Sequence, residues 1–269
     1  MAVLVYGALW LALVLYAVNL ARPVHWSGRA ATGVVALSLC ALTALLGARG
    51  LAAGHWPLTT RYEFALCFVW SILGAYLIVE ATWRNRGGGL FVMAVALLLA
   101  TYALVRPLDE QAVRPLLPAL RSGWLQVHVL SAAVGYGAFG VAAGLAAMQL
   151  VRPASGGRPG FPSSETGEGA MERAVRLGLP WLTLSILAGA IWAQNAWGRY
   201  WGWDPKESWA LVTWLWFLMV LHVPRSGARG WGGRRLAWLV LAGFGIVCFT
   251  FAGLPWLIRT VRLESLHAF

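Results

Sequence analysis

The chain has 269 residues, of which 59% are hydrophobic and only 12% are charged. Soluble domains carry about 25% charged residues, so this composition excludes an ordinary soluble globule and predicts an all-α, polytopic membrane protein. The net charge of +11 comes almost entirely from arginines spread over short connections, as membrane topology requires, and no basic run is long enough to bind nucleic acid.

Apolar runs of about 18 residues or more recur along the chain, and each is long enough to span a bilayer. They predict one transmembrane domain over residues 1–269, a helical bundle of about eight helices near 3–20, 31–49, 63–82, 89–105, 124–151, 176–197, 205–223 and 236–257. The first run lacks the basic start and the cleavage site of a signal peptide, so we expect it to be a retained helix.

An even number of spans places both termini on the same side of the membrane. The connections on one side hold twelve arginines, and those on the other side hold nine basic residues. Because the cytoplasmic side carries the excess, both termini are expected to be extracytoplasmic. The longest polar piece, 153–175, is rich in Gly, Pro and Ser, which predicts a flexible cytoplasmic loop.

Residues 197–214, WGRYWGWDPKESWALVTW, contain five tryptophans between two apolar runs. An interfacial aromatic belt needs fewer rings at each helix end, so this density predicts an external platform for a large planar ligand. We expect the platform to consist of Trp197, Tyr200, Trp201 and Trp203. The two later tryptophans fall within the next helix, where Trp214 is expected to be a packing residue.

A helix start follows the platform at Asp204-Pro205-Lys206-Glu207. Asp is a good N-cap, Pro suits the first position, and Glu three residues after the cap completes a capping box. A structural role for Asp204 is therefore favoured over direct ligand contact. Arg199 and Lys206 are placed to meet ligand carboxylates, which a porphyrin carries and a quinone lacks. Tryptophan density alone does not separate these two ligands.

Two histidines are expected on the side of the tryptophans. His128 lies about one turn inside the fifth helix, and His267 lies in the C-terminal tail. Two neutral imidazoles can bind haem iron from opposite faces. The structural alternative for a membrane histidine is a hydrogen bond to a neighbouring helix. Because both histidines accompany the tryptophans, we favour iron ligation.

The other three histidines either lie far from the tryptophan segment or have no role that the sequence defines. His222 lies 17 residues after Pro205, about 26 Å along a helix, so it cannot bind the same iron. An ionisable residue inside a membrane is a functional candidate, and exposure at the helix end is the rival interpretation. His25 is expected in a cytoplasmic loop, and the role of His55 in an external loop is left open.

The tryptophan segment closely resembles the WWD signature of haem-handling proteins of cytochrome c maturation, and its form WGxYWxWDPKExWxxxTW is similar to the CcsA (ResC) family. Four further segments are similar to this family in order and spacing: GHWPLTTRYEFALCFVW, WLQVHVLSAAVGYGAF, WLWFLMVLHV and LESLHAF. The resemblance covers roughly residues 50–269. The related CcmC and CcmF types fit less well in helix number or length.

The resemblance implies that His128 and His267 ligate haem iron at an external site and that His222 holds haem during its passage through the membrane. The segment that contacts the haem would include Trp197, Trp201, Trp203, Asp204 and Arg199. It further implies haem b as the transported substrate, a separate CcsB (ResB) subunit, an apocytochrome c with a CxxCH motif, and a place in the bacterial cytoplasmic membrane.

The expected function is that of the haem-handling subunit of a cytochrome c synthase, active only with its partner. The chain offers no obvious nucleophile, so its contribution would be the positioning of a reactive group. A thiol-reducing partner is implied indirectly, because the chain has no CxxC pair. Two alternatives are a haem exporter or chaperone without synthase activity, and a cytochrome b or quinone-type electron-transfer subunit.

Overall fold

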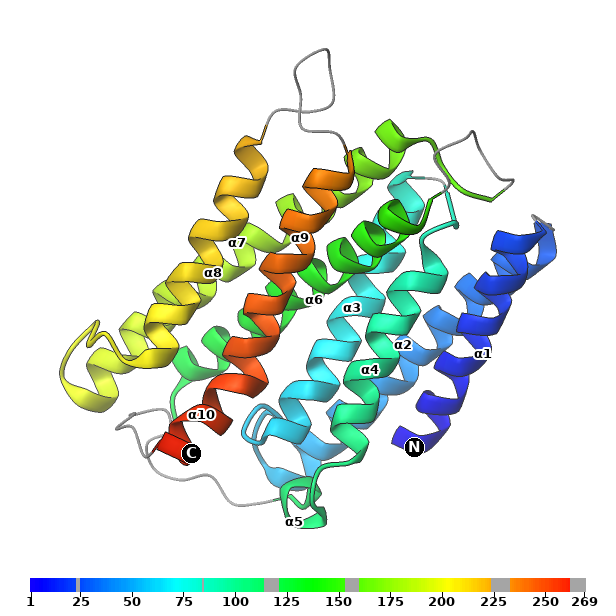
Figure 1. Ribbon diagram of the computed structural model, residues 1–269. Coiled ribbons are helices and arrows are strands. Elements are labelled where there is room, and N and C mark those ends of the chain that lie inside the picture. The colour runs from blue at the N-terminus through cyan, green and yellow to red at the C-terminus, as the bar shows by residue number, and fades with distance from the viewer. Residues whose placement is uncertain (23–24, 84, 114–120, 153–159, 224–232, 262–269) are drawn as a thin grey trace.

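Helices account for nearly all of the computed structural model, which describes residues 1–269 except 23–24, 84, 114–120, 153–159, 224–232 and 262–269 (Figure 1). The described residues contain no strand, so the predicted all-α class is confirmed. The helices are α1 Ala2–Ala21, α2 His25–Ala53, α3 Arg61–Trp83, α4 Gly89–Leu104, α5 Leu108–Gln111, α6 Gly123–Val151, α7 Ser164–Trp197, α8 Pro205–His222, α9 Gly233–Cys248, the π-helix η2 Phe249–Gly253, and α10 Leu254–Val261.

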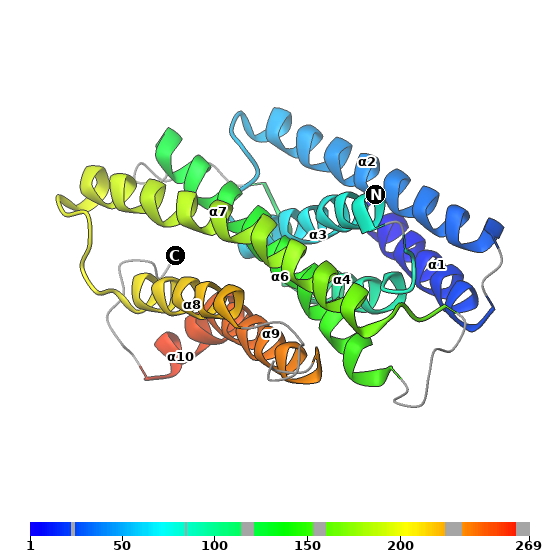
Figure 2. The same ribbon diagram turned by 90° about the horizontal axis from the view of Figure 1, so that it is seen from above.

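Helix α6 is the centre of the bundle, where it contacts α3, α4, α7 and α9. Seen from above, α1 and α2 lie on one flank and α8 to α10 on the other (Figure 2). Glycines let the backbones approach closely: a Cβ on Gly137 would lie 2.3 Å from Cβ of Ser71, and one on Gly144 would lie 2.7 Å from Cα of Val92. Small residues of this kind are typical of packed membrane helices.

A buried carboxylate ties the peripheral α1–α2 pair to α3. The Oη atom of Tyr16 donates to Glu80 at 2.7 Å, the hydroxyl of Thr32 donates to it at 2.5 Å, and Nε of Arg86 forms an ion pair with it at 3.1 Å. A charge buried away from water requires such partners. Glu80 therefore holds three helices together at one end of the bundle.

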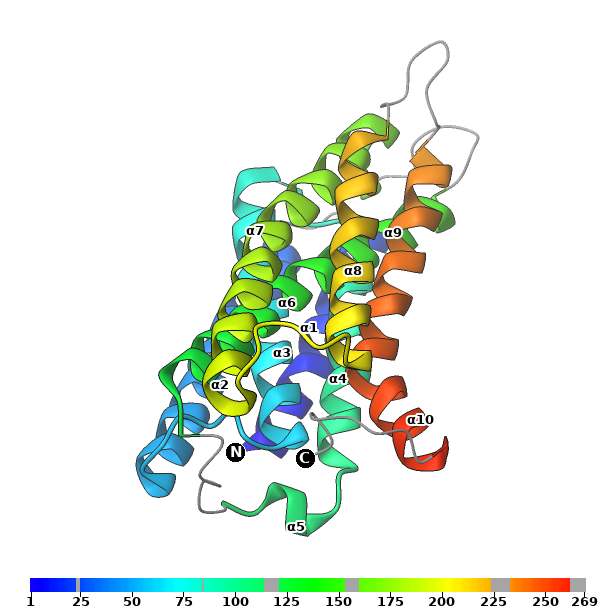
Figure 3. The ribbon, with the colours of Figure 1, turned by 90° about the vertical axis from the view of Figure 1, so that its left-hand side faces the viewer.

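Six helices in the described part of the chain are long and apolar enough to cross a membrane. The two other predicted spans are α4, which has 16 residues, and α8, whose first turn is polar. Both run alongside the longer helices (Figure 3). The architecture is that of a multi-pass integral membrane protein.

The predicted boundaries are wrong in three places. Helix α7 begins at Ser164 rather than near 176, so residues 164–175 of the predicted loop are helical; the hydroxyl of Ser163 caps this helix by accepting from the Thr166 amide at 3.2 Å. His25, expected in a loop, is the first residue of α2. The last predicted helix is interrupted by η2.

Different segments of the chain gather at the two ends of the bundle. The start of α1, the α2–α3 connection, the α7–α8 connection and α10 lie at the lower end in Figure 1, which we call the tryptophan end. The end of α3, the start of α7 and the end of α8 lie at the opposite end. The terminal helices thus begin and end on one side of the bundle, as predicted. Which side faces the cytoplasm stays a prediction.

Candidate functional site

The start of α8 is a complete capping box. Oδ1 of Asp204 accepts from the Lys206 amide at 2.9 Å, and Oε2 of Glu207 accepts from the Asp204 amide at 3.1 Å. The same oxygen of Glu207 accepts from the Gly202 amide at 2.8 Å. The predicted structural role of Asp204 is confirmed, and its direct contact with a ligand stays a prediction. Both carboxylates thus fix the shape of the preceding loop.

The loop between α7 and α8 holds one aromatic residue in an unusual conformation. Trp203 has φ +55°, in the left-handed region that costs a residue with a Cβ about 1–3 kcal/mol. Its side chain is 70% exposed, and its ring meets that of Trp201 edge to face, with centroids 5.7 Å apart. Such strain persists where the surroundings hold it, here through the capping box that follows. The loop therefore exposes an indole ring at the surface of the molecule.

A chain of rings connects the tryptophan segment to His128. The centroid of Trp197 lies 4.7 Å from that of Trp192, and Trp192 lies 6.4 Å from the His128 ring, nearly parallel to it at 17°. Trp192 is only 2% exposed. Sequence reasoning missed Trp192, whose only signal was its place five residues before Trp197 on the same helix. The structure thus places two predicted site residues, Trp197 and His128, on either side of a buried indole.

His128 is half-buried and bonded to α7. Its Nδ1 atom lies 2.8 Å from the backbone oxygen of Ser185 and 3.1 Å from its hydroxyl. A carbonyl oxygen can only accept, so Nδ1 carries the proton and Nε2 of the neutral ring bears the lone pair. This is the usual arrangement of a metal-binding histidine, whose second nitrogen donates to a carbonyl or carboxylate. The hydrogen bond to a neighbouring helix and iron ligation are therefore compatible.

The other predicted histidines lie elsewhere. His222 is exposed at the end of α8, with Nδ1 2.7 Å from the backbone oxygen of Leu218. It is the last of the 18 residues of α8, whose first residue follows the tryptophan loop, so the two lie at opposite ends of one helix. His267 lies outside the described residues. His55 lies at the tryptophan end, with Nδ1 2.9 Å from the backbone oxygen of Trp56.

Four cationic side chains lie in or near the tryptophan loop. Arg199 is exposed and folds over Gly202, where a Cβ would lie 2.7 Å from its Nε atom. Lys206 is close enough to Arg61, the first residue of α3, for the two charges to interact. The neighbouring Arg49 forms an ion pair with buried Glu63 at 3.0 Å. Arginine and lysine side chains are the residues that bind carboxylates in proteins, so this end is a candidate for carboxylate binding.

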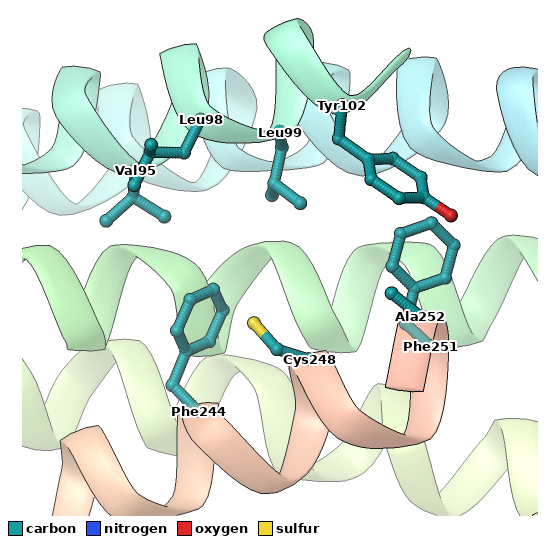
Figure 4. Close-up of a pocket in the computed structure, with 8 residues that line it drawn as sticks. All are labelled: Val95, Leu98, Leu99, Tyr102, Phe244, Cys248, Phe251 and Ala252. Atoms are coloured by element: carbon teal, nitrogen blue, oxygen red, sulfur yellow. The ribbon is translucent and has the colours of Figure 1, made fainter. Parts of the chain in front are cut away.

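An apolar groove of about 240 Å³ lies between α4 and the junction of α9 with η2 (Figure 4). Apolar side chains line most of it, together with Tyr102 and Cys248. None of the predicted haem-binding residues lines the groove. The groove is therefore separate from the tryptophan and histidine cluster.

Comparison with known proteins decides the family. A family model described as "Cytochrome C assembly protein" matches residues 58–262. "Cytochrome c biogenesis protein CcsA" of Synechocystis sp. is 33% identical, and the similarity covers 88% of this chain and 88% of that protein. The proteins of the same description from Microcystis aeruginosa and Guillardia theta are also 33% identical, over 86% and 84% of this chain. The chain belongs to the CcsA family.

Family membership makes this a cytochrome c biogenesis protein and implies the involvement of haem. The part that matches the family model extends from the α2–α3 connection to the end of α10. It includes His128, the tryptophan loop and His222, and it ends before His267. Membership in CcsA favours cytochrome c assembly over the electron-transfer class that composition and tryptophan density left open.

Proposed function

We propose that this CcsA protein conveys haem b across the bacterial cytoplasmic membrane and presents it at the tryptophan end for covalent attachment to apocytochrome c. The observation that carries the proposal is the contact series from Trp197 through Trp192 to His128, whose protonated Nδ1 leaves Nε2 as the iron-binding nitrogen. The separation of His222 by the full length of α8 supports a second, earlier position for the same substrate.

The residues at the tryptophan end match the chemistry of haem. Haem has a flat apolar ring, which indoles cover by stacking and burial. Its two propionates require cations, which Arg199, Lys206 and Arg61 supply. Its iron accepts neutral imidazole as an axial ligand. We assign one axial position to His128 and the opposite one to His267.

In the proposed reaction, His128 holds the iron while Trp201 and Trp203 fix the ring plane. The two cysteines of the CxxCH motif then reach the haem vinyl groups. Each S–H adds across one C=C bond, so that the sulfur bonds to one carbon and the proton ends on the other. No oxidant or reductant is consumed. The cysteines must arrive reduced, which assigns an indirect role to a thiol-reducing partner.

The partner subunit is proposed to be a separate CcsB (ResB) protein. The described residues at the tryptophan end offer a platform and ligands in the connections between helices, and recognition of the apocytochrome is assigned to the second chain. The synthase would therefore be active only as a complex of the two chains.

The decisive experiment is to purify the chain with its CcsB partner and record the haem content and absorption spectrum of wild type and His128→Ala. We expect the variant to lose most of its haem, and added imidazole to restore part of it by filling the vacant axial position. Full haem content in His128→Ala would contradict the proposal.

The second candidate function is haem export without attachment, since every site residue described above would serve it equally well. Co-expression with the partner and a CxxCH apocytochrome separates the two functions. Covalent, thioether-linked haem on the apocytochrome supports the synthase. Haem bound to the complex without any covalent product supports the exporter.

A further inference from the structure

His128 occupies a seat formed by one face of α7. The seat consists of Ser185, Gly189 and Trp192, which are spaced four and three residues apart and so share one side of the helix. Ser185 is hydrogen-bonded to Nδ1 of the imidazole, Gly189 lies against the ring edge, and the Trp192 ring is nearly parallel to it. We call these three residues the His128 seat.

Ser185 and His128 bond to each other in both directions. Nδ1–H of His128 is directed to the backbone oxygen of Ser185 at 2.8 Å, with the hydroxyl at 3.1 Å. The Ser185 hydroxyl donates in turn to the backbone oxygen of His128 at 2.9 Å. Ser185 is buried. This reciprocal pair locks α6 to α7 at the imidazole and selects one tautomer of the ring.

Gly189 provides the space that the ring occupies. A Cβ at this position would lie 2.6 Å from Nδ1 and 2.9 Å from Cε1 of His128, closer than side chains tolerate. Glycine inside a helix costs about 1 kcal/mol relative to alanine, so helix formation alone favours alanine here. The glycine therefore serves the placement of the imidazole.

We propose that Ser185 and Gly189 are positioning residues that fix the tautomer and the direction of His128 for axial binding of haem iron. This inference rests on the proposed function, because it assigns a purpose to the orientation of a ligand. The seat holds the ring by its Nδ1 edge, so Nδ1 is the nitrogen that α7 engages and Nε2 is the nitrogen assigned to iron. A ring held in advance loses less freedom when it binds iron.

The main test is Gly189→Ala, with Gly169→Ala as the matched control. Both glycines lie in α7, and a Cβ on Gly169 would meet nothing within 4 Å. Both variants are expected to fold, since alanine favours the helix. At matched protein levels in the complex with CcsB, Gly189→Ala should retain several-fold less haem, and its spectrum should show loss of an axial histidine. Gly169→Ala should resemble wild type.

The same substitution in a protein that lacks His128 separates a positioning role from a general loss of structure. In His128→Gly supplied with imidazole, Gly189→Ala should cause no further loss of haem, because free imidazole is not tethered to α6 and can shift away from the added methyl group. A further loss there would overturn the inference. Ser185→Ala is expected to give a smaller loss than Gly189→Ala, because the backbone acceptor of Ser185 remains.

A haem-free measurement reports the orientation itself. In protein labelled with ¹⁵N-histidine, the nitrogen shifts of His128 should indicate protonated Nδ1 in wild type and a mixture of tautomers in Gly189→Ala. An unchanged tautomer in Gly189→Ala would also overturn the inference. The two proposals fail in different ways: normal haem in His128→Ala removes the ligand role, whereas loss in His128→Ala together with normal haem in Gly189→Ala removes only the seat.

Discussion

At the scale of single residues, the indole of Trp203 is exposed although its backbone conformation is unfavourable, and we propose that it contacts haem. Its positive φ would suit glycine, which adopts this conformation without penalty. The edge-to-face contact with Trp201 keeps the ring in place. Strained, exposed aromatics of this kind point to a role outside folding.

Substitutions of Trp203 can separate an effect on haem binding from an effect on the free energy of unfolding. Trp203→Gly should raise the free energy of unfolding by about 1 kcal/mol relative to Trp203→Ala, since it relieves the strained φ. Both variants should lose haem to the same extent, whereas Trp203→Phe should retain more, because it keeps a ring. Thermal unfolding and haem content of the purified complex are the measurements. Normal haem in Trp203→Gly would mean that the indole does not contact haem.

A second residue-scale feature is the Glu63 carboxylate, which is 2% exposed at the tryptophan end. It accepts from the amide and the hydroxyl of Thr59, both at 3.0 Å, and pairs with Arg49 of α2. Glu63 belongs to the segment GHWPLTTRYEFALCFVW, which resembles the CcsA family, and its carboxylate is a structural anchor. It fixes the α2–α3 connection.

Breaking this anchor should destabilise the fold. Glu63→Gln leaves Arg49 without its partner, and removing one member of a buried pair costs about 3–5 kcal/mol. The double variant Glu63→Gln/Arg49→Gln should recover part of the loss, because no lone charge remains. Unfolding temperatures in detergent measure both effects. A double variant less stable than Glu63→Gln alone would contradict the assignment of a simple ion pair.

At the scale of elements, the start of α8 sets the shape of the tryptophan loop through the caps on Gly202, Asp204 and Lys206. Asp204→Ala should cost about 1 kcal/mol of local stability and lower haem content indirectly. Asp204→Ser or Asp204→Asn keeps an acceptor at the cap and should restore haem. If Asp204→Ser loses as much haem as Asp204→Ala, the carboxylate itself contacts the ligand or a partner. Haem content at matched protein levels decides.

The helices show what the sequence can and cannot predict. Uniform apolar runs locate α1, α3 and α6 well, because length and hydropathy alone define a span. The first turns of α7 were missed because residues 164–175 are amphipathic, burying Glu168 and Met171 while exposing polar neighbours. The capping box was recognised because it is local.

The relations between helices are what sequence reasoning lacked. Nothing local to Ser185 or Gly189 indicates that they face His128, since that depends on how α6 and α7 are rotated against each other. Trp192 was missed for the same reason. The tryptophans and histidines proposed for the site could be predicted from composition and spacing. The residues that orient them could be identified only from the packing of the helices.

At the scale of the whole molecule, the proposed function requires haem to leave one side of the bundle and arrive at the other. His222 and the tryptophan loop occupy opposite ends of α8, so one subunit presents both positions along one helix. The direction of transport then depends only on which end faces the cytoplasm. The excess of arginines on the connections opposite the tryptophan end favours an external tryptophan end.

Reporter fusions test this orientation directly. A reporter joined after Phe269 or inserted beside Arg199 should report an extracytoplasmic location. Arg199 lies in the tryptophan loop, and the C-terminus is predicted to be on the same side of the membrane. One inserted within residues 153–159 should report the cytoplasm, and this site avoids the helical start of α7, where Gly167 packs against Gln149. Insertions that abolish protein accumulation are replaced by single cysteines at the same places, labelled from outside the cell. Reversed signals would place His222 at the exit and require haem to move in the opposite direction.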